Sequence, residues 1–364
     1  MLPPAHGTIH QGSSRTIAFI QFSSGSTGNP KGVIVTHENV YSNTCAINNR
    51  FETRDGDSFL SWMPLTHDMG LISFHITPLI KGVNQYIMPT SVFIRRPTLW
   101  FKKINDHNIT ITSSPNFGYK YFLKMFKPEI AADWDLSRLR IIVNGAEPIS
   151  SELCNEFLDK MAPYGLQRTS IRPAYGLAEA TVAVSLTDGK TEFVPIHLDR
   201  SLLNIGQEIV ISDKSTEHTL TFVEVGHAID DCAIRICDDH DRILPDKVIG
   251  HIQIQGKNVT AGYYNNRETT ADMFTADQWV RTGDLGFFID GSLFMTGRFK
   301  DMIIVNGQNI YPHDIERTAE EVEGVELGKI AACGVYNKER GEDDIVVFVV
   351  SKKMMLTSPR CPKA

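Results

Sequence analysis

The sequence has no long apolar run, no run of basic residues and no closely paired cysteines. No apolar stretch approaches the roughly 20 residues that span a bilayer, so no transmembrane helix is expected. The start Met1-Leu2-Pro3-Pro4 lacks a basic region followed by an apolar one, which argues against an export signal. A net charge of −7 argues against nucleic-acid binding, because phosphate backbones are bound by excess lysine and arginine. We therefore expect a cytoplasmic protein with neither nucleic acid nor membrane among its partners.

The six cysteines are scattered through the chain without the spacing of metal ligands. They are Cys45, Cys154, Cys232, Cys237, Cys333 and Cys361. Cys232 and Cys237 flank Ala-Ile-Arg-Ile, an alternating strand pattern that places the two thiols on opposite faces. Neither a zinc site nor a redox pair fits this arrangement, so we expect reduced cysteines that pack in the core.

The first half of the chain has the pattern of an α/β domain. From Thr16 to about Ser185, short apolar runs alternate with helical patterns, which predicts a largely parallel, doubly wound sheet. Thr36 is expected to cap one helix, and Pro97 to lie in the first turn of another. The predicted strands are Ile17–Phe22, Phe59–Met63, Gln85–Met88, Ile109–Thr112 and Leu139–Val143.

The second half changes to alternating strands and tight turns after about Asp188. We expect a large domain over residues 1–299 that includes this β-rich subdomain. Residues 300–350 then read as the start of a small, mobile C-terminal α/β domain. Residues 351–364 mix Lys, Pro and Ser without periodicity, which predicts a disordered tail.

The segment from Phe22 to Gly32 concentrates hydroxyls, glycines and one lysine in a single turn. Glycines let the backbone approach an anion, hydroxyls add donors, and Lys31 brings a positive charge to a polyphosphate. This is not a Walker loop, because Lys31 is followed by Gly32 and a β-branched run rather than by Ser or Thr and a helix. The pattern predicts strand, loop, strand, and a flexible surface loop is the alternative.

Further polar segments follow predicted strands, and each of them could also be a structural turn. His67 and Asp68 come after the strand that ends at Met63, where a pocket wall with a polar edge could form. Gly145, Ala146 and Glu147 follow the strand that ends at Val143, at the edge where open α/β sheets bind ligands.

Aromatic and acidic residues later in the chain complete a possible nucleotide site. Tyr175, followed by Gly176, offers a ring that could stack on a base, and Glu179 a carboxylate that could hold Mg²⁺ against phosphates. Asp284 follows a tight turn and could accept hydrogen bonds from both ribose hydroxyls. The segment from Gly297 to Pro312 has the polar, glycine-rich character of an interdomain hinge or a plain linker.

In this order, the motifs resemble the adenylate-forming (acyl-activating, AMP-binding) superfamily over about residues 16–350. The motifs that carry the resemblance are SSGSTGNPKG, YGLAEAT, GHIQIQG…AGYY, RTGDL and GRFKD. Within it the chain looks most like fatty acyl-AMP ligases and the acyl-ligase loading domains of polyketide and nonribosomal peptide synthetases. HDMG at residues 67–70 and NIYPHDIE at residues 309–316 resemble signatures of that subfamily, and residues 193–225 correspond to its insertion.

The resemblance implies a role for each matched residue. Ser23, Ser24, Gly25, Ser26, Thr27, Gly28 and Lys31 would bind the ATP phosphates, with Thr27 and Glu179 at Mg²⁺ and Thr27, Lys31 and Glu179 in catalysis. Gly145, Ala146 and Glu147 would border the adenine, Tyr175 and Gly176 would contact the base, and Asp284 with Arg298 would hold the ribose. His67 and Asp68 would line the acyl pocket, and Lys300 would be the hinge of the small domain.

The implied reaction is ATP-dependent activation of a fatty acid, or another carboxylic acid, to acyl-AMP with release of pyrophosphate. The acyl group would then pass to the phosphopantetheine thiol of an acyl carrier protein. Family members have a longer portion before the phosphate loop and a late lysine in a PKTxxGK-like motif, which this sequence lacks. We therefore expect a fragment that is truncated at both ends, with reduced activity. An amino-acid adenylation domain, an acyl-CoA synthetase and a non-catalytic adenylate-binding remnant are the alternatives.

Overall fold

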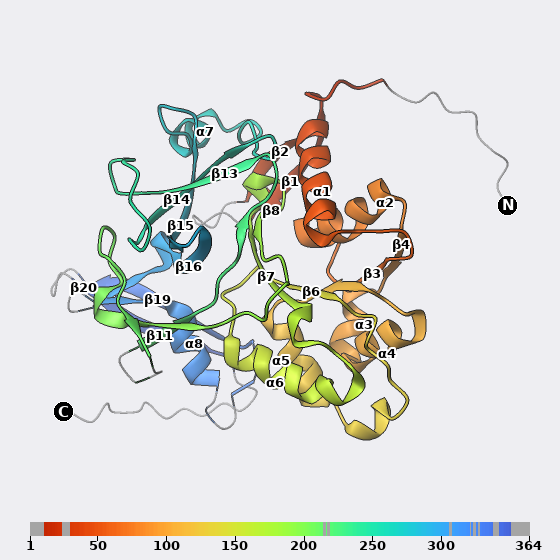
Figure 1. The fold of residues 1–364 in the computed structure, drawn as a ribbon. Helices are drawn as coiled ribbons and strands as arrows, with labels where there is room; N and C mark the ends of the chain where they lie inside the picture. The colour runs from red at the N-terminus through yellow and green to blue at the C-terminus, as the bar shows by residue number, and fades with distance from the viewer. Residues whose placement is uncertain are drawn as a thin grey trace. The chain divides into compact units, whose positions relative to one another are not determined.

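The computed structural model divides the chain into two compact units, Met1–Thr296 and Gly297–Ala364 (Figure 1). It describes residues 11–23, 30–213, 216, 219–305, 308–320, 322, 325–326, 328–337 and 342–350. The predicted domain boundary at residue 299 stays a prediction. The predicted disordered tail, residues 351–364, lies outside the described residues.

A seven-stranded sheet forms the centre of the first unit, in the order β12-β8-β7-β6-β5-β3-β4. Neighbouring strands from β4 to β7 are parallel, whereas β8 is antiparallel to both β7 and β12. The strands are β3 Ser58–Ser61, β4 Asn84–Ile87, β5 Ile111–Ser113, β6 Ile141–Asn144, β7 Ile171–Gly176, β8 Ala183–Leu186 and β12 His227–Ala228. The largely parallel sheet predicted from the sequence is confirmed, although predicted strand ends differ by up to two residues.

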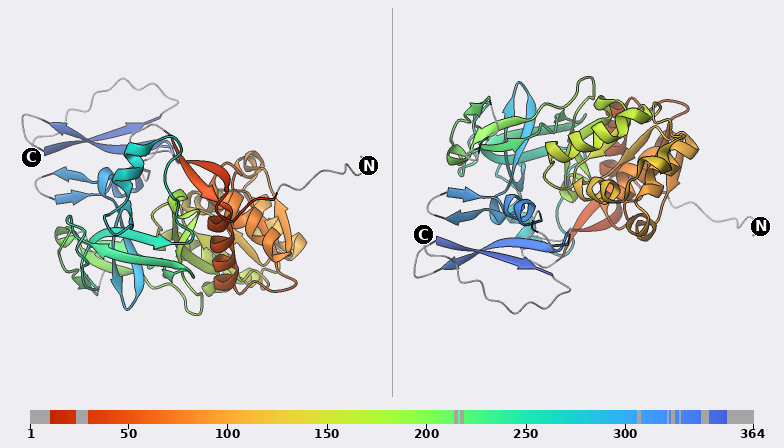
Figure 2. Two further views of the ribbon diagram at one scale, coloured as in Figure 1. Left: turned by 90° about the horizontal axis from the view of Figure 1, so that it is seen from above. Right: turned by 90° about the horizontal axis from the view of Figure 1, so that it is seen from below.

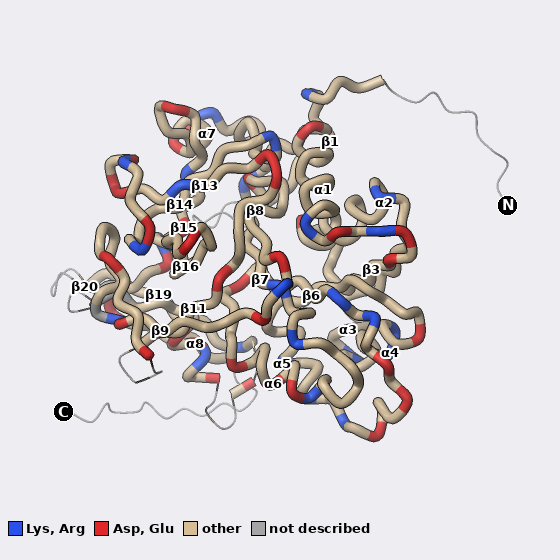
Figure 3. Tube along the Cα trace, viewed as in Figure 1, with Lys and Arg blue, Asp and Glu red and all other residues tan. Residues whose placement is uncertain are grey.

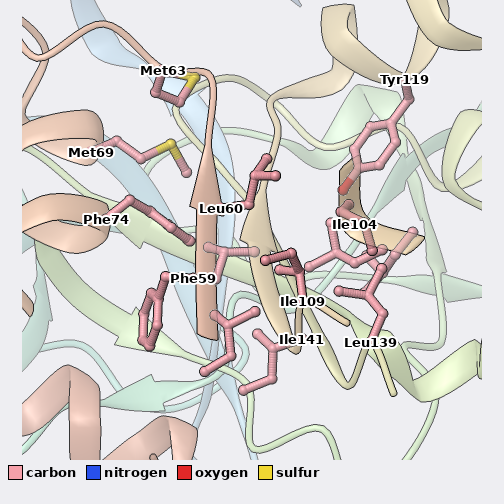
Figure 4. Close-up of a cluster of buried hydrophobic side chains, with 14 of the residues drawn as sticks. Phe59, Leu60, Met63, Met69, Phe74, Ile104, Ile109, Tyr119, Leu139 and Ile141 are labelled. Atoms are coloured by element: carbon pink, nitrogen blue, oxygen red, sulfur yellow. The ribbon is translucent and has the colours of Figure 1, made fainter. Parts of the chain in front are cut away.

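Helices cover both faces of this sheet because its short strands are apolar on both sides. Figure 1 shows α1 and α2 on one side of the strands and α3 to α6 on the other. On the first side Phe59 contacts Phe74, with ring centroids 5.9 Å apart, and Figure 4 shows Ile104 and Tyr119 across the strand. The helices are α1 His37–Phe51, the π-helix η1 Met69–Ile76, α2 Thr77–Lys81, α3 Thr90–Arg95, α4 Thr98–His107, α5 Asn116–Met125 and α6 Ser151–Met161.

Two predicted helix starts can be compared with the observed caps. The Thr36 hydroxyl accepts from the backbone N–H of Asn39, at 3.2 Å, and so caps α1 as predicted. Pro97 is the N-cap residue of α4 instead of lying in its first turn. Short 3₁₀ helices occupy Pro128–Ala131, Ala162–Tyr164, Arg168–Ser170, Ala178–Ala180, Arg200–Leu202 and Phe299–Asp301.

The β-rich part of the first unit contains a hairpin and two small sheets. The hairpin pairs β1 Ile17–Ser23 with β2 Lys31–Thr36. One sheet has the order β10-β9-β11, with β9 Ile196–Asp199, β10 Ile211–Ser212 and β11 Thr219–Phe222. The other has the order β13-β14-β15-β16, with β13 Cys232–Cys237, β14 Gly250–Gly256, β15 Val280–Ile289 and β16 Ser292–Arg298, and α7 Arg267–Met273 precedes β15.

The second unit is a small α/β arrangement. Its elements are β17 Ile303–Val305, β18 Gln308–Ile310, α8 Pro312–Glu320, β19 Ile330–Asn337 and β20 Glu342–Val349. The strands pair as two antiparallel ladders, β17 with β18 and β19 with β20. Glu316 of α8 accepts from the backbone N–H of Ala332 in β19, at 2.9 Å, which fixes the helix against that ladder.

The five described cysteines are free, as expected, but only Cys154 and Cys237 are buried in the core, whereas Cys45, Cys232 and Cys333 are half-buried. Figure 3 shows basic and acidic positions interspersed along the described part of the trace. Cys154 is buried, and burial raises the pKa of its thiol to about 12, so it remains a protonated core residue. Among the described residues no helix has both the length and the apolar content needed to cross a membrane.

Candidate nucleotide site

The β1–β2 hairpin frames the glycine-rich segment. Ser23, the last residue of β1, pairs with Lys31, the first residue of β2, which confirms the predicted strand, loop and strand. Ser24, Gly25, Ser26, Thr27 and Gly28 lie outside the described residues. The two ends of the loop are therefore fixed at one end of a regular ladder.

Lys31 lies against the segment that follows β14. Its Nζ is 5.1 Å from the ring centroid of Tyr263, a cation–π distance. The backbone of this segment also joins the hairpin, since Ile34 N donates to Gly262 O at 3.0 Å and Tyr264 N to Gly32 O at 2.7 Å. Figure 2 shows the red hairpin beside the teal segment in both views.

Tyr263 connects Lys31 to Glu179. Its hydroxyl donates to Glu179 Oε1 at 2.7 Å. Burial and the neighbouring Glu179 carboxylate raise the pKa of Tyr263 well above its ordinary value, so the phenol remains a donor. Tyr263 lies in the motif GHIQIQG…AGYY, which by itself predicts no role for this residue, and only the fold brings Tyr263 between the two predicted phosphate-site residues.

Tyr175 and Asp284 contact each other directly. The Tyr175 hydroxyl donates to Asp284 Oδ2 at 2.6 Å, and both side chains are nearly buried. The backbone of β15 turns toward this contact at Gly283, which has φ 81. The Thr282 hydroxyl supports the turn by accepting from Asp284 N at 3.1 Å. The two residues predicted separately for base and ribose thus form one hydrogen-bonded pair. Tyr175 lies near the end of β7, four residues before Glu179.

The carboxyl end of β6 carries Gly145, Ala146 and Glu147. A Cβ at Gly145 would lie 2.9 Å from Ala174 O in β7, which explains glycine at this close approach. Ala146 has φ 70, and Glu147 Oε1 accepts from the backbone N–H of Phe117 in the first turn of α5, at 2.9 Å. Glu147 therefore has a structural bond at a helix N-terminus, in addition to its predicted place beside the base.

His67 and Asp68 form a pair before the π-helix η1. His67 Nδ1 is 2.8 Å from Asp68 Oδ1, and the hydrogen bond raises the pKa of His67 although burial opposes it. Asp68 also accepts from Met69 N at 2.7 Å. Gln21 of β1 ties this turn to the hairpin by donating to Thr66 O at 2.9 Å.

The described residues can be compared with what magnesium requires. They contain no group of three or more His, Cys, Asp or Glu side chains that could hold a metal by themselves. Nucleotide-bound Mg²⁺ needs only one or two carboxylates, because phosphates and waters supply the other ligands. Glu179 fits this requirement, with Oε1 held by a neutral hydroxyl.

Gly176 also has a structural role, whereas Arg298 and Lys300 cannot be placed at this site. A Cβ at Gly176 would lie 1.8 Å from Val182 O, so the close approach at the end of the antiparallel β7–β8 pair requires glycine. Arg298 and Lys300 belong to the second unit, and their predicted places at the ribose and the hinge stay predictions.

The fold and these residues together define an adenylation-type α/β protein. A structure from a study of fatty acyl-adenylate ligases of E. coli and L. pneumophila matches with a TM-score of 0.88 and 34% identity. The aligned region covers 97% of this chain and 63% of the matched chain. The McyG adenylation and carrier structure matches with a TM-score of 0.84 and 31% identity, over 98% of this chain and 52% of that chain.

Residues 4–264 match the family of AMP-binding enzymes, and the chain belongs to that family. It is 36% identical to the long-chain-fatty-acid–AMP ligase FadD32 of Mycolicibacterium smegmatis, over 88% of this chain and 54% of the relative. It is also 36% identical to the medium-chain-fatty-acid–[acyl-carrier-protein] ligase JamA of Moorena producens, over 85% of this chain and 54% of the relative. The chain thus spans about half the length of these curated relatives.

Proposed function

We propose that the protein activates a fatty acid by ATP-dependent adenylation, which forms acyl-AMP and releases pyrophosphate. The observation that carries the proposal is the continuous row from Lys31 through Tyr263 to Glu179. This row begins where the glycine-rich loop joins β2 and ends at a carboxylate suited to magnesium. Membership of the AMP-binding family supports ATP as the nucleotide.

In this proposal the contacts of each residue match its part in the reaction. Lys31, with Ser23 and the loop, binds phosphates, and Glu179 helps to hold Mg²⁺, which neutralises phosphate charge when it is bound. Tyr175 contacts the base and Asp284 the ribose, and their mutual hydrogen bond holds the two side chains next to each other. His67 and Asp68 border the acyl group, and Arg298 and Lys300 act from the second unit.

We further propose that the whole protein transfers the acyl group to the phosphopantetheine thiol of an acyl carrier protein. Support comes from the medium-chain-fatty-acid–[acyl-carrier-protein] ligases among the relatives, JamA of Moorena producens and TtuA of Teredinibacter turnerae. Because the chain spans about half of their length, we assign nucleotide binding to this chain and the complete reaction to the whole protein.

Two assays test this function. ATP–pyrophosphate exchange with fatty acids of graded chain length measures adenylation, and calorimetry with α,β-methylene-ATP and Mg²⁺ measures nucleotide binding separately. Asp284→Ala should weaken nucleotide affinity about 100-fold, because two hydrogen bonds to a charged group are lost. Asp246→Ala, at an exposed position of the same subdomain, is the control and should leave affinity unchanged. A chain that binds no ATP analogue would overturn the proposal.

A further inference from the structure

The turn between Glu179 and β8 has a strained backbone at Thr181. Thr181 has φ 70 and ψ −61, and Val182 N donates to Ala180 O at 2.8 Å. These values define a γ-turn with positive φ, which is rare and strained, and a β-branched residue adopts it at a further steric cost. Strain of this kind persists only where surrounding contacts enforce it, and such positions cluster at functional sites.

Two fully buried asparagines enforce this turn. Asn43 of α1 donates from Nδ2 to Ala183 O at 2.9 Å and to Ala180 O at 3.2 Å, and its Oδ1 accepts from Ala183 N at 3.2 Å. Asn258, in the segment after β14, donates to the same carbonyls at 3.1 and 3.3 Å. Both carbonyls thus accept from two side-chain amides that arrive from segments far apart in the sequence.

The segment that contains Asn258 also holds Glu179 itself. Thr260 N donates to Glu179 O at 2.8 Å, and the Tyr263 hydroxyl binds the Glu179 carboxylate. The Thr181 hydroxyl donates to Asn258 O at 2.6 Å. Asn39, one turn before Asn43 on α1, donates to Lys257 O at 2.7 Å, so the helix and the segment form one clamp around residues 179–183.

We propose that Asn43 and Asn258 are positioning residues that hold the strained turn at Thr181 and thereby direct the Glu179 carboxylate toward nucleotide-bound magnesium. The inference rests on the proposed function, because it takes Glu179 as the metal carboxylate. Without the amides the γ-turn relaxes to a less strained conformation, and the backbone that carries Glu179 moves with it. Amides suit this task because they bind the turn without adding a charge beside Glu179.

The main test measures how strongly magnesium increases nucleotide affinity. The ratio of α,β-methylene-ATP affinities with Mg²⁺ and with EDTA is measured by calorimetry on the full chain. Asn43→Ala should lower this ratio about tenfold, as expected for a partner of a metal-binding group. The matched control is Asn48→Ala, which removes a buried asparagine from the same helix that donates to Thr77 O, at 3.1 Å, away from the turn. This control should leave the ratio unchanged.

Two further variants separate positioning from general loss of structure. Glycine adopts positive φ without strain, so the effect of Asn43→Ala should shrink several-fold in a Thr181→Gly background. Asn258→Ala removes the other pair of hydrogen bonds to the carbonyls of Ala180 and Ala183. This variant tests the same claim if Asn43→Ala does not fold. Hydrogen exchange of residues 177–186 without nucleotide should accelerate in both asparagine variants and not in Asn48→Ala.

The possible outcomes distinguish this inference from the proposed function. If the unaltered chain binds the analogue more tightly with Mg²⁺ and both asparagine variants keep the same ratio, the inference is wrong and the proposed function stands. An equal effect of Asn43→Ala with Thr and with Gly at position 181 also overturns it. If the unaltered chain binds no analogue, the proposed function fails, and the inference fails with it.

Discussion

The two edges of the seven-stranded sheet use charge in opposite ways. At the amino-terminal edge, Asp57 before β3 and Arg140 before β6 form a two-point ion pair, with oxygen–nitrogen distances of 2.5 and 3.2 Å. Arg140 also donates to Phe51 O, at 2.7 Å, where α1 ends. At the carboxyl edge, Glu179 accepts instead from the neutral hydroxyl of Tyr263. The first edge pairs its carboxylate with a guanidinium, whereas at the second the Glu179 carboxylate accepts from a neutral hydroxyl.

This difference separates stability from function. The pair at the amino-terminal edge joins two strands to the end of a helix, where positive charge is favourable. Arg172 lies close to Arg140, and burial together with the Arg140 charge lowers the pKa of Arg172 to about 10. Positive φ occurs at both edges, at Glu52 where α1 ends and at Ala146 after β6, but the strained γ-turn at Thr181 lies on the carboxyl side.

The largest expected effect is at the amino-terminal edge. Asp57→Ala should lower the free energy of unfolding by roughly 3 kcal/mol, because it leaves the Arg140 charge without its carboxylate in a largely buried position. Affinity for α,β-methylene-ATP should not change, because Asp57 lies at the opposite edge from the candidate site. Urea denaturation and calorimetry measure the two quantities.

A surface ion pair provides the control for this variant. Lys102→Ala breaks an exposed pair with Asp106 on α4 and should change stability by no more than about 0.5 kcal/mol. A large loss of nucleotide affinity in Asp57→Ala would contradict the separation of the two edges.

The next largest effect is expected at the carboxyl edge. Tyr263→Phe removes the hydroxyl that holds Glu179 Oε1, but it keeps the ring under Lys31. It should weaken binding of the magnesium nucleotide about tenfold, the cost of one hydrogen bond to a charged group, with little change in stability. Tyr264→Phe, at the adjacent exposed position, is the matched control and should bind normally. Equal affinities for the two variants would remove Tyr263 from the site.

The sequence predicted the elements better than the contacts between them. Alternating apolar runs and the cap at Thr36 led to the sheet and α1, because these depend on local periodicity and local hydrogen bonds. The family was predicted in a different way, from the resemblance of the ordered motifs to those of known members, and the family match confirms it. The sequence predicts a β-rich part after about Asp188 and an insertion over residues 193–225, but the order β10-β9-β11 is known only from the strand pairing.

Four features of the site could not be predicted from local sequence. The π-helix η1 begins where a Cβ at Gly70 would lie 2.3 Å from Pro64 O, a close approach that the residue pattern does not reveal. The contact between Tyr175 and Asp284 spans 109 residues, and the contact between Glu179 and Tyr263 spans 84. Asn43 gives no sequence signal at all, because a buried asparagine on a helix is recognised only when its carbonyl partners are known.

The smallest expected effect is a difference in how the two edges change the stability of the fold with pH. Burial alone would raise the pKa of Asp57, but hydrogen bonds from Arg140 and Arg54 outweigh it, so the pKa lies below its ordinary value. Its contribution to stability is therefore complete above about pH 4 and is lost as the pH falls through the lowered pKa.

His67 should respond in the opposite direction. The hydrogen bond to Asp68 raises its pKa, so its contribution is complete below about pH 6.5 and is lost as the pH rises through the raised pKa. The effect should be small because 44% of the His67 side chain is exposed.

Melting temperatures across about pH 3 to pH 9 measure both responses, since this range includes the ordinary pKa values of both groups. His67→Gln should flatten only the neutral-to-alkaline part of the profile and Asp57→Asn only the acidic part. A His67→Gln profile that stays parallel to that of the unaltered chain would show that this pair does not contribute to stability.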